Sequence, residues 1–219
     1  MIKNPFSGKF ITGEGTDGAG KATQLDLLQA DIAKTNVNLV FTKEPTNDSL
    51  GWEIYDILNN RHKTLKLEEM SGLDMQRLYF QNRRTQYRNV ILPCLRGGVS
   101  VMSDRGLVSV VFGIETRDDV KRFLDIERAM FLARDVQFIV PDLTLIYMVD
   151  PDVAVARLRE KKRDLDLFET REMIAKVAER YRWAAELIPN CVLIDANRPA
   201  DEVYADTRKQ VLELLGVKI

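Results

Sequence analysis

The fold of this chain is decided by one short stretch, KFITGEGTDGAGKAT at residues 9–23. It begins with β-forming residues that predict a strand, and residues 20–34 then carry leucines at helical spacing. Between the two, Gly15, Gly20 and Lys21 fit the pattern G-x-x-x-x-G-K. Such a loop points successive backbone N–H groups at a phosphate, and the following helix presents its positive end. The stretch therefore predicts a phosphate-binding loop, with a turn that only joins strand to helix as the alternative.

One position of the loop departs from the pattern. Lys21 supplies a mobile positive charge for the β- and γ-phosphates, but Ala22 follows where a Ser or Thr hydroxyl would bind Mg²⁺. Thr23 lies about 100° further round the helix and is not an obvious substitute. Phosphate binding is expected all the same. The expected ATP-binding residues are Gly15, Thr16, Asp17, Gly18, Ala19, Gly20, Lys21, Ala22 and Thr23.

Beyond this loop, apolar β-rich runs alternate with helical patterns. Strands are expected at residues 9–12, 38–42, 99–103, 143–149 and 192–194. Helices are expected at residues 20–34, 67–95, 120–134, 152–162, 169–187 and 200–215. This alternation predicts a parallel sheet covered on both faces, and ligands of such sheets bind at the carboxyl ends of the strands. The chemistry is therefore expected just after Thr12, Thr42, Ser103 and Val149.

The composition excludes several classes of protein. The 219 residues carry 32 Lys and Arg against 33 Asp and Glu, so a net charge of −1 gives no general attraction for nucleic acid or membranes. Two cysteines and one histidine exclude a Cys/His metal cluster. The longest apolar run, residues 143–149, is too short to span a bilayer, and no secretory signal opens the chain. We therefore expect a cytoplasmic enzyme of one domain that binds neither nucleic acid nor membrane.

Charged side chains follow the second and third predicted strands. After the third strand, the Asp104 carboxylate can hold Mg²⁺ or its waters, and the Arg105 guanidinium can clamp a phosphoryl group with two hydrogen bonds. After the second strand, Lys43 and Glu44 are expected at the same edge of the sheet. The alternatives are a salt bridge for the first pair and a solvated turn for the second.

Two helical segments supply further candidates. Phe80 and Arg84 are four residues apart and share a helix face, where an aromatic ring beside a guanidinium suits a nucleobase. A phenylalanine packed in the core is the alternative. Further along, a run of cations predicts a lid that brings positive charge onto the phosphates, formed by Arg157, Arg159, Lys161, Lys162 and Arg163. A solvated helix end, whose dipole favours cations, is the alternative there.

Taken together, these segments resemble the thymidylate kinase family, a group of P-loop nucleoside monophosphate kinases. The matching segments follow the family's order and are residues 10–24, 42–45 and 78–84, Asp104-Arg105 with Ser109, and residues 141–144. The resemblance implies a three-layer α/β P-loop NTPase fold, with helices flanking a five-stranded parallel sheet and a short lid at about residues 157–168. It also implies a single domain over residues 1–219, a homodimer, and transfer of the γ-phosphate of ATP to dTMP with Mg²⁺.

The resemblance also implies roles on the acceptor side of the site. Asp17 would bind the sugar 3′-hydroxyl, Phe80 would stack on thymine, and Arg84 would contact a thymine carbonyl. Ser109 would lie near the base. Lys43 stands where bacterial members usually have arginine.

On the transfer side, the resemblance implies that Asp104 and Glu44 serve the metal and its waters, with Glu44 near the acceptor nucleotide. Arg105 would hold phosphate between donor and acceptor. Gly18 is similar to members whose catalytic arginines lie in the lid. The expected catalytic residues are therefore Lys21, Asp104, Arg105, Arg157, Arg159 and Arg163.

Departures from the family pattern leave alternatives open. Ala22 lacks the metal-binding hydroxyl, Tyr55 replaces an arginine for the acceptor phosphate, and Val110-Val111-Phe112-Gly113 replaces a base-contacting segment. Where the family's lid usually has Asp-Arg, this chain has Asp166-Leu167. The alternatives are a kinase for another nucleoside monophosphate or a deoxynucleoside, and a nucleotide-binding module without turnover.

A phosphate monoester acceptor is mostly dianionic at neutral pH and needs no general base. The presence of a single histidine in the sequence agrees with such an acceptor.

Overall fold

Five parallel strands form the centre of the molecule in the computed structural model, which describes residues 2–161 and 170–217. The strands are β1 (Phe10–Gly15), β2 (Leu39–Lys43), β3 (Ser100–Asp104), β4 (Leu143–Met148) and β5 (Cys191–Asp195). Their order in the sheet is β2-β3-β1-β4-β5, and every neighbouring pair is parallel. β1 is buried along its whole length because helices cover both faces. Every strand that the sequence predicts is therefore confirmed, with small shifts at the ends.

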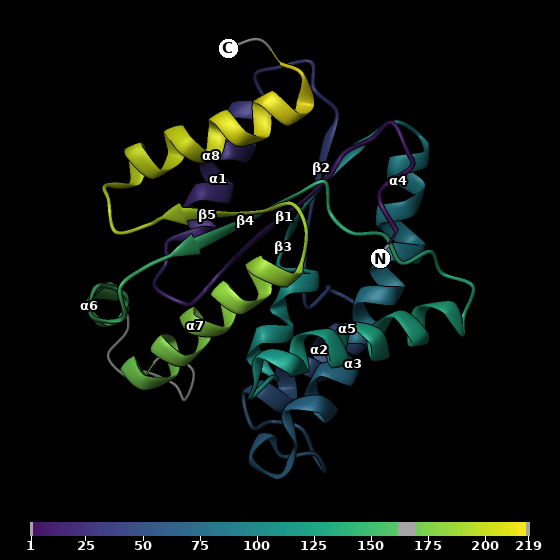
Figure 1. Cartoon of the computed structure of the whole chain (residues 1–219), viewed down its shortest axis with the longest axis vertical. Helices are drawn as coiled ribbons and strands as arrows, with labels where there is room; N and C mark the ends of the chain where they lie inside the picture. Colours follow the sequence, from purple (N-terminus) through teal and green to yellow (C-terminus); the bar gives the residue numbers. More distant parts are fainter. Residues whose placement is uncertain (1, 162–169, 218–219) are drawn as a thin grey trace.

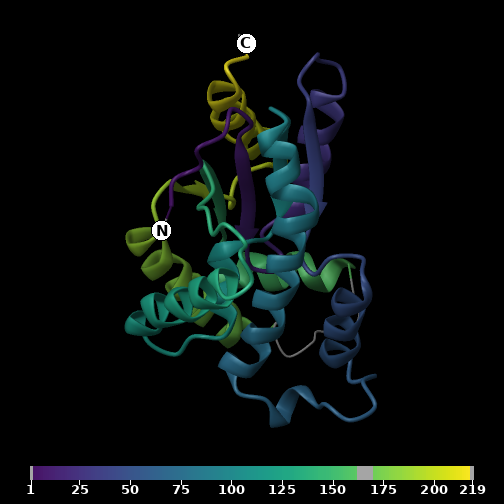
Figure 2. The same cartoon turned by 90° about the vertical axis from the view of Figure 1, so that its right-hand side faces the viewer.

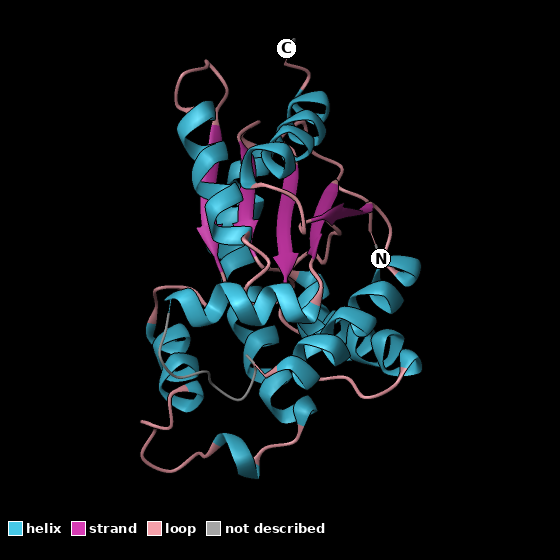
Figure 3. Cartoon of the chain, turned by 90° about the vertical axis from the view of Figure 1, so that its left-hand side faces the viewer, coloured by secondary structure: helices cyan, strands magenta, loops and turns pink. Residues whose placement is uncertain are grey.

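Helices cover the sheet on both faces and complete the three layers (Figures 1 and 3). One face carries α1 (Lys21–Ile32) and α8 (Ala200–Leu215), and the other α3 (Gly72–Gln86), α4 (Leu92–Arg96), α5 (Arg117–Leu132) and α7 (Arg171–Leu187). Phe10 and Ile11 are neighbours in β1 and point to opposite faces, so each belongs to a different apolar core. The predicted three-layer α/β fold is confirmed.

The helix expected at residues 67–95 is present but begins later. A separate helical turn spans Leu67–Glu69, and α3 starts just after Ser71, whose side chain accepts a hydrogen bond from the Asp74 N–H. A π-helical turn, Tyr87–Ile91, joins α3 to α4, and Figure 2 shows the run as one long helix beside the sheet.

The sequence pattern does not predict α2 (Ser49–Leu58), which packs beside α3. Its first turn contains Gly51, a poor helix former, and this glycine weakens the sequence signal. A Cβ atom at Gly51 would lie 1.7 Å from the carbonyl oxygen of Thr46. The same glycine therefore lets α2 approach the loop that follows β2.

The strand ends line up at one edge of the sheet. Asp104 lies opposite both Gly13 of β1 and Lys43 of β2 in the register of the sheet. α6 (Pro151–Lys161) follows β4 at the same edge. The charged residues that follow the strands therefore meet the phosphate loop, as the parallel arrangement predicts.

Three further observations concern the chain as a whole. In the two stretches that the structure describes, no helix has both the length and the apolar character that crossing a membrane requires. Cys94 and Cys191 are free thiols. Of the lid expected at about residues 157–168, the structure describes the part up to residue 161, where it continues α6.

Candidate active site

Three glycines shape the loop after β1. Gly15, Gly18 and Gly20 have φ angles of 153°, 79° and 83°, a region that favours glycine. A Cβ atom at Gly18 would lie 2.6 Å from the carbonyl oxygen of Ala154 in α6. The loop is therefore held in a left-handed conformation and packed tightly against α6.

The start of α1 is open towards this loop. Gly20 precedes the helix without a side-chain hydrogen bond, and its first turn holds no acidic residue. The first N–H groups of a helix have no partner inside it, and with the helix dipole they attract an anion. Ala22 and Thr23 are exposed on this first turn. This is the geometry that a phosphate-binding loop requires.

Lys21 reaches from α1 to the end of β3. Its ammonium pairs with the Asp104 carboxylate, and its side chain is 11% exposed. Burial, and then the nearby charge of Arg105, lower the pKa of Lys21. The predicted loop lysine and the predicted metal carboxylate are therefore in direct contact.

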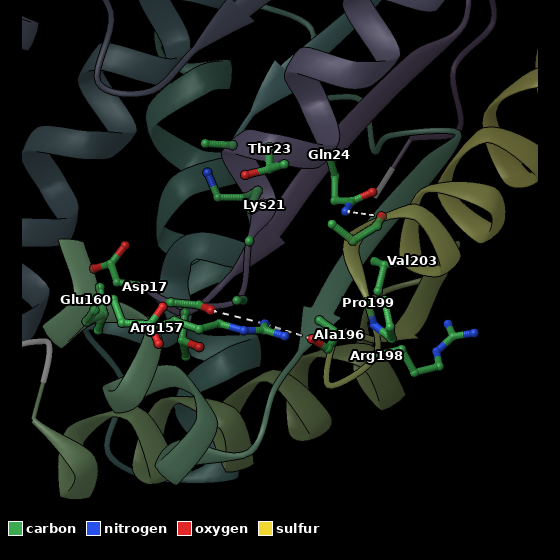
Figure 4. Close-up of a pocket in the computed structure, with 17 residues that line it drawn as sticks. Asp17, Lys21, Thr23, Gln24, Arg157, Glu160, Ala196, Arg198, Pro199 and Val203 are labelled. Atoms are coloured by element: carbon green, nitrogen blue, oxygen red, sulfur yellow. Dashed lines mark hydrogen bonds between the residues drawn. The ribbon is translucent and has the colours of Figure 1, made fainter.

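A cavity of about 410 Å³ opens beside the loop (Figure 4). Arg157 of α6 crosses it and donates from Nη1 to the carbonyl oxygen of Ala196 at 2.9 Å and to that of Gly18 at 3.5 Å. On the other side, Gln24 of α1 is buried and donates to the carbonyl oxygen of Ala200 at 3.0 Å. The volume lies within the range of small-molecule sites.

The far wall of this cavity is not identified from the sequence. It is formed by Ala196, Arg198, Pro199, Ala200 and Val203. These residues follow β5, a strand to which no motif is attached. The signal that finds them is the general rule that ligands bind after parallel strands, applied to the last strand as well as to the first four.

The arginines expected in the lid differ in position. Arg157 lines the cavity, whereas Arg159 is exposed and does not line it. Arg163 lies outside the described residues. Of the two that the structure describes, Arg157 alone reaches the loop.

Arg105 lies between the loop and the segment after β3. Its φ is 70°, its Nη2 lies 3.4 Å from Asp17 Oδ1, and its Cζ lies 4.7 Å from the ring centre of Phe112. Its Nη1 is buried and has no hydrogen-bond partner among residues 2–161 and 170–217. Because a buried guanidinium nitrogen without a partner is costly, a ligand oxygen is the natural acceptor for it.

Glu14 is a buried carboxylate of β1 that motif reasoning misses. It accepts hydrogen bonds from the Gly106 N–H and the Ser109 hydroxyl, both at 2.8 Å, and from the Tyr181 hydroxyl at 3.3 Å. The Tyr181 oxygen also accepts from the Gly15 N–H at 3.1 Å. Burial raises the pKa of Glu14 to about 7. The signal that could find it is an acidic residue inside a strand that is otherwise buried.

A second buried network joins the end of β2 to α3 and α5. Arg83 of α3 donates from Nε to both Glu44 oxygens at 2.9 Å and from Nη2 to Glu44 Oε2 at 2.8 Å. Its Nη1 donates to Glu127 Oε1 of α5 at 2.6 Å. Burial alone would lower the pKa of Arg83, but the Glu127 and Glu44 carboxylates raise it above its ordinary value. We refer to Glu44, Arg83 and Glu127 as the acceptor-side triad.

The two residues predicted to bind a base do not join this triad. Phe80 is fully buried in the apolar core, and Arg84 donates to a backbone carbonyl of α5 at 3.2 Å. The residues one position earlier are Tyr79 and Arg83: burial raises the pKa of Tyr79 to about 12, and the charges of Arg105, Glu44 and Arg83 act on it. One residue corresponds to about 100° round a helix, so Tyr79 and Arg83 share a face that is turned away from the face of Phe80 and Arg84.

Lys43 is exposed where β2 ends. Its ammonium lies 5.6 Å from the centre of the Tyr55 ring in α2. The loop that follows is fixed by Asn82, which accepts from the Thr46 N–H at 3.1 Å. Lys43 and Tyr55 therefore meet beside the triad, at the position where the family resemblance implies two arginines.

The two carboxylates expected to serve a metal differ in availability. Asp104 is 32% exposed, whereas Glu44 is 2% exposed and both of its oxygens accept from Arg83. Mg²⁺ usually takes one or two carboxylates together with substrate phosphates and waters. Asp104 fits this donor set, and Glu44 does not fit as a direct ligand. Within the described stretches, no group of three or more His, Cys, Asp or Glu could hold an ion by itself.

Comparisons with known proteins identify the family of this chain. The thymidylate kinase family model matches residues 14–207. A thymidylate kinase of Ralstonia nicotianae is 35% identical over 217 residues, which cover 95% of this chain and 100% of the relative. Thymidylate kinases of Janthinobacterium sp. and Cupriavidus metallidurans are each 36% identical, over 92% and 90% of this chain and 95% and 94% of the relatives. The chain belongs to the thymidylate kinase family.

Proposed function

We propose that this protein transfers the γ-phosphate of ATP to dTMP and forms ADP and dTDP, a step of dTTP synthesis. The observation that carries the proposal is the meeting of the phosphate loop, Lys21 and Arg105 at the end of the sheet, in a chain of this family. None of the comparisons favours another acceptor or a module without turnover.

On the donor side, the backbone N–H groups from Gly15 to Thr23 bind the β- and γ-phosphates, and the adenosine occupies the cavity beside Arg157. Lys21 moves from Asp104 to the phosphate oxygens when ATP binds. Mg²⁺, when bound, would supply neutralising charge at those oxygens. Asp104 is the residue that would hold it, because its carboxylate is partly exposed beside Lys21.

At the transfer step, the dianionic phosphate of dTMP attacks the γ-phosphorus without a general base. Arg105 donates from its unpartnered Nη1 to the transferring group. Glu14 holds Arg105 in place indirectly, since it binds the N–H of the next residue, Gly106. Catalysis on this account consists of positioning and charge neutralisation.

On the base side, Tyr79 rather than Phe80 stacks on thymine, and Arg83 rather than Arg84 donates to a thymine carbonyl. The support is the burial of Phe80 in the core and the attachment of Arg84 to α5. Ser109 lies near the base, held by Glu14. Each pair of alternatives consists of adjacent residues, so single substitutions distinguish them.

The remaining contacts to the acceptor nucleotide are proposed from the charges of the side chains and their positions in the site. Asp17 binds the sugar 3′-hydroxyl beside Arg105. Lys43 binds the acceptor phosphate, with the Tyr55 ring keeping its ammonium near the end of β2. Glu44 acts by orienting Arg83 and not as a metal ligand.

Family membership also supports proposals about the location, the oligomeric state and the lid of the protein. The chain would act in the cytoplasm as a homodimer, each subunit a single domain with a lid at about residues 157–168. Arg157, Arg159 and Arg163 would then bring positive charge onto the phosphates when the lid closes.

The test is ADP release with Mg²⁺ and ATP across dTMP, dUMP, UMP, CMP, AMP, GMP and thymidine. A strong preference for dTMP supports the proposal. Preference for another acceptor would keep the mechanism and reject the substrate. ATP binding without turnover on any acceptor would reject the enzyme.

A further inference from the structure

The acceptor-side triad contains one carboxylate more than its charge requires. The bidentate pair between Arg83 and Glu44 already balances one positive charge with one negative charge. Glu127 adds a second carboxylate, and its side chain is fully buried. Burial raises the pKa of Glu127 to about 7, because the charged form is unfavourable there. A buried carboxylate beyond the one that balances the guanidinium carries a desolvation cost, so charge balance alone does not explain Glu127.

The hydrogen bonds of the Arg83 guanidinium indicate a different role for Glu127. A guanidinium has five N–H donors in a fixed plane. In Arg83, Nε and Nη2 each donate to Glu44, and Nη1 donates to Glu127. Glu44 comes from the end of β2 and Glu127 from α5, so the plane of the guanidinium is fixed from two separate elements. Two N–H groups, one on Nη1 and one on Nη2, are left without an acceptor in the described part of the chain, on a side chain that is fully buried before a base binds.

We propose that Glu127 is a positioning residue for base selection, which fixes the Arg83 guanidinium so that its two remaining N–H groups meet a pyrimidine carbonyl. The inference rests on the proposed function, in which Arg83 contacts the base. Arginine donates hydrogen bonds and cannot accept them. Arg83 held in one plane therefore donates to the 4-carbonyl oxygen of thymine and offers no acceptor to the 4-amino group of cytosine. Glu127 touches neither substrate, and acts on the choice of base through Arg83 alone.

The test compares three substitutions of Glu127. Glu127→Gln keeps an oxygen for Nη1 and removes the charge, whereas Glu127→Asp keeps the charge and withdraws the oxygen by one methylene. Glu127→Ala removes both. For each variant, kcat and KM are measured with dTMP and with dCMP, and KM with ATP. The matched control is Asp31→Asn on the opposite face of the sheet, which weakens the 2.7 Å pair with Arg208.

The expected result is a loss of base discrimination that follows the lost contact and not the lost charge. Glu127→Asp and Glu127→Ala lower the preference for dTMP over dCMP in kcat/KM by about 10-fold to 100-fold, the worth of one charged hydrogen bond. KM for ATP stays unchanged. Glu127→Gln retains most of the preference, as does Asp31→Asn. If Glu127→Ala does not fold, the contrast between Gln and Asp carries the test.

Two outcomes would overturn the inference. In the first, all Glu127 variants keep the wild-type preference for dTMP while their melting temperatures fall, which shows a structural role only. In the second, Glu127→Asp keeps the wild-type preference for dTMP while Glu127→Gln loses it, which shows that charge and not position matters. Failure of the proposed function is seen separately, because the wild-type protein itself would then show no preference for dTMP.

Discussion

The proposed donor side of the site, at the phosphate loop, and the proposed acceptor side, at the triad, are built in different ways. The donor side relies on backbone: Gly15, Gly18 and Gly20 shape the loop, and the open start of α1 supplies N–H groups. The acceptor side relies on buried side chains, with the Arg83 guanidinium held between two carboxylates. A backbone site depends on room and conformation, whereas a buried ionic site depends on every member of its network. The two sides should therefore fail differently when they are mutated.

The largest effect is expected for Lys21→Ala on the donor side. Removing a charge that neutralises transferring phosphate should lower kcat by about 10³-fold to 10⁵-fold. The melting temperature should hardly change, because the partner of Lys21, Asp104, is partly exposed and can be solvated. Steady-state ADP release and thermal unfolding measure the two. An unchanged kcat would remove the phosphate-loop interpretation.

On the acceptor side, adjacent substitutions test the side-chain network. Arg83→Leu leaves two carboxylates buried without a partner and should lower the free energy of unfolding by about 3–5 kcal/mol. Arg84→Leu removes one hydrogen bond to a carbonyl and should lower it by about 1 kcal/mol. Urea unfolding of both variants gives the comparison. Equal losses would contradict the placement of Arg83 inside and Arg84 outside the network.

Glu14 joins the two sides, and its titration should be visible in stability. A carboxyl whose pKa is raised from 4.5 to about 7 binds its proton more tightly in the folded state. The protonated carboxyl therefore stabilises the folded protein at low pH. The free energy of unfolding should fall by about 3 kcal/mol as pH rises from about 4.5 to about 7.

Glu14→Gln should remove that part of the pH dependence, which urea unfolding at about pH 5 and about pH 8 measures. The unfolding free energy of the wild-type protein should fall more between these two pH values than that of the variant. Parallel pH curves would show that Glu14 is ionised in the folded protein at both.

The smallest effects are expected from two glycines of the loop. Both have a positive φ, but a Cβ atom would clash with Ala154 at Gly18 and would meet nothing within 4 Å at Gly20. Gly18→Ala should lower the free energy of unfolding by about 2 kcal/mol, and Gly20→Ala by about 1 kcal/mol. KM for ATP should rise more in Gly18→Ala than in Gly20→Ala. If the two variants behave alike, conformation matters and the contact with α6 does not.

The same contrast explains what the sequence could predict. Strands, most helices and the phosphate loop follow from local patterns, because glycine spacing and apolar periodicity act over a few residues. α2 is missed because the close approach of Gly51 to Thr46 is a tertiary contact. Local propensity counts that glycine only as unfavourable.

The acceptor side could be predicted only in part. Motif spacing points to one turn of α3 but does not show that Arg83, and not Arg84, meets Glu44 and Glu127. Those two carboxylates come from residues 39 and 44 positions away. Glu14 illustrates the same limit, since its partner Tyr181 lies 167 positions away.

The open start of α1 means that a bound nucleotide would add to the stability of the folded protein. No side chain caps this helix, so a bound phosphate completes hydrogen bonds that the described chain leaves to solvent. A ligand present at 100 times its Kd adds about 2.7 kcal/mol to the stability of the form that binds it. On the proposed function, the supply of nucleotide would therefore limit how often the chain opens to proteases, and the abundance of the protein in a cell would follow that supply.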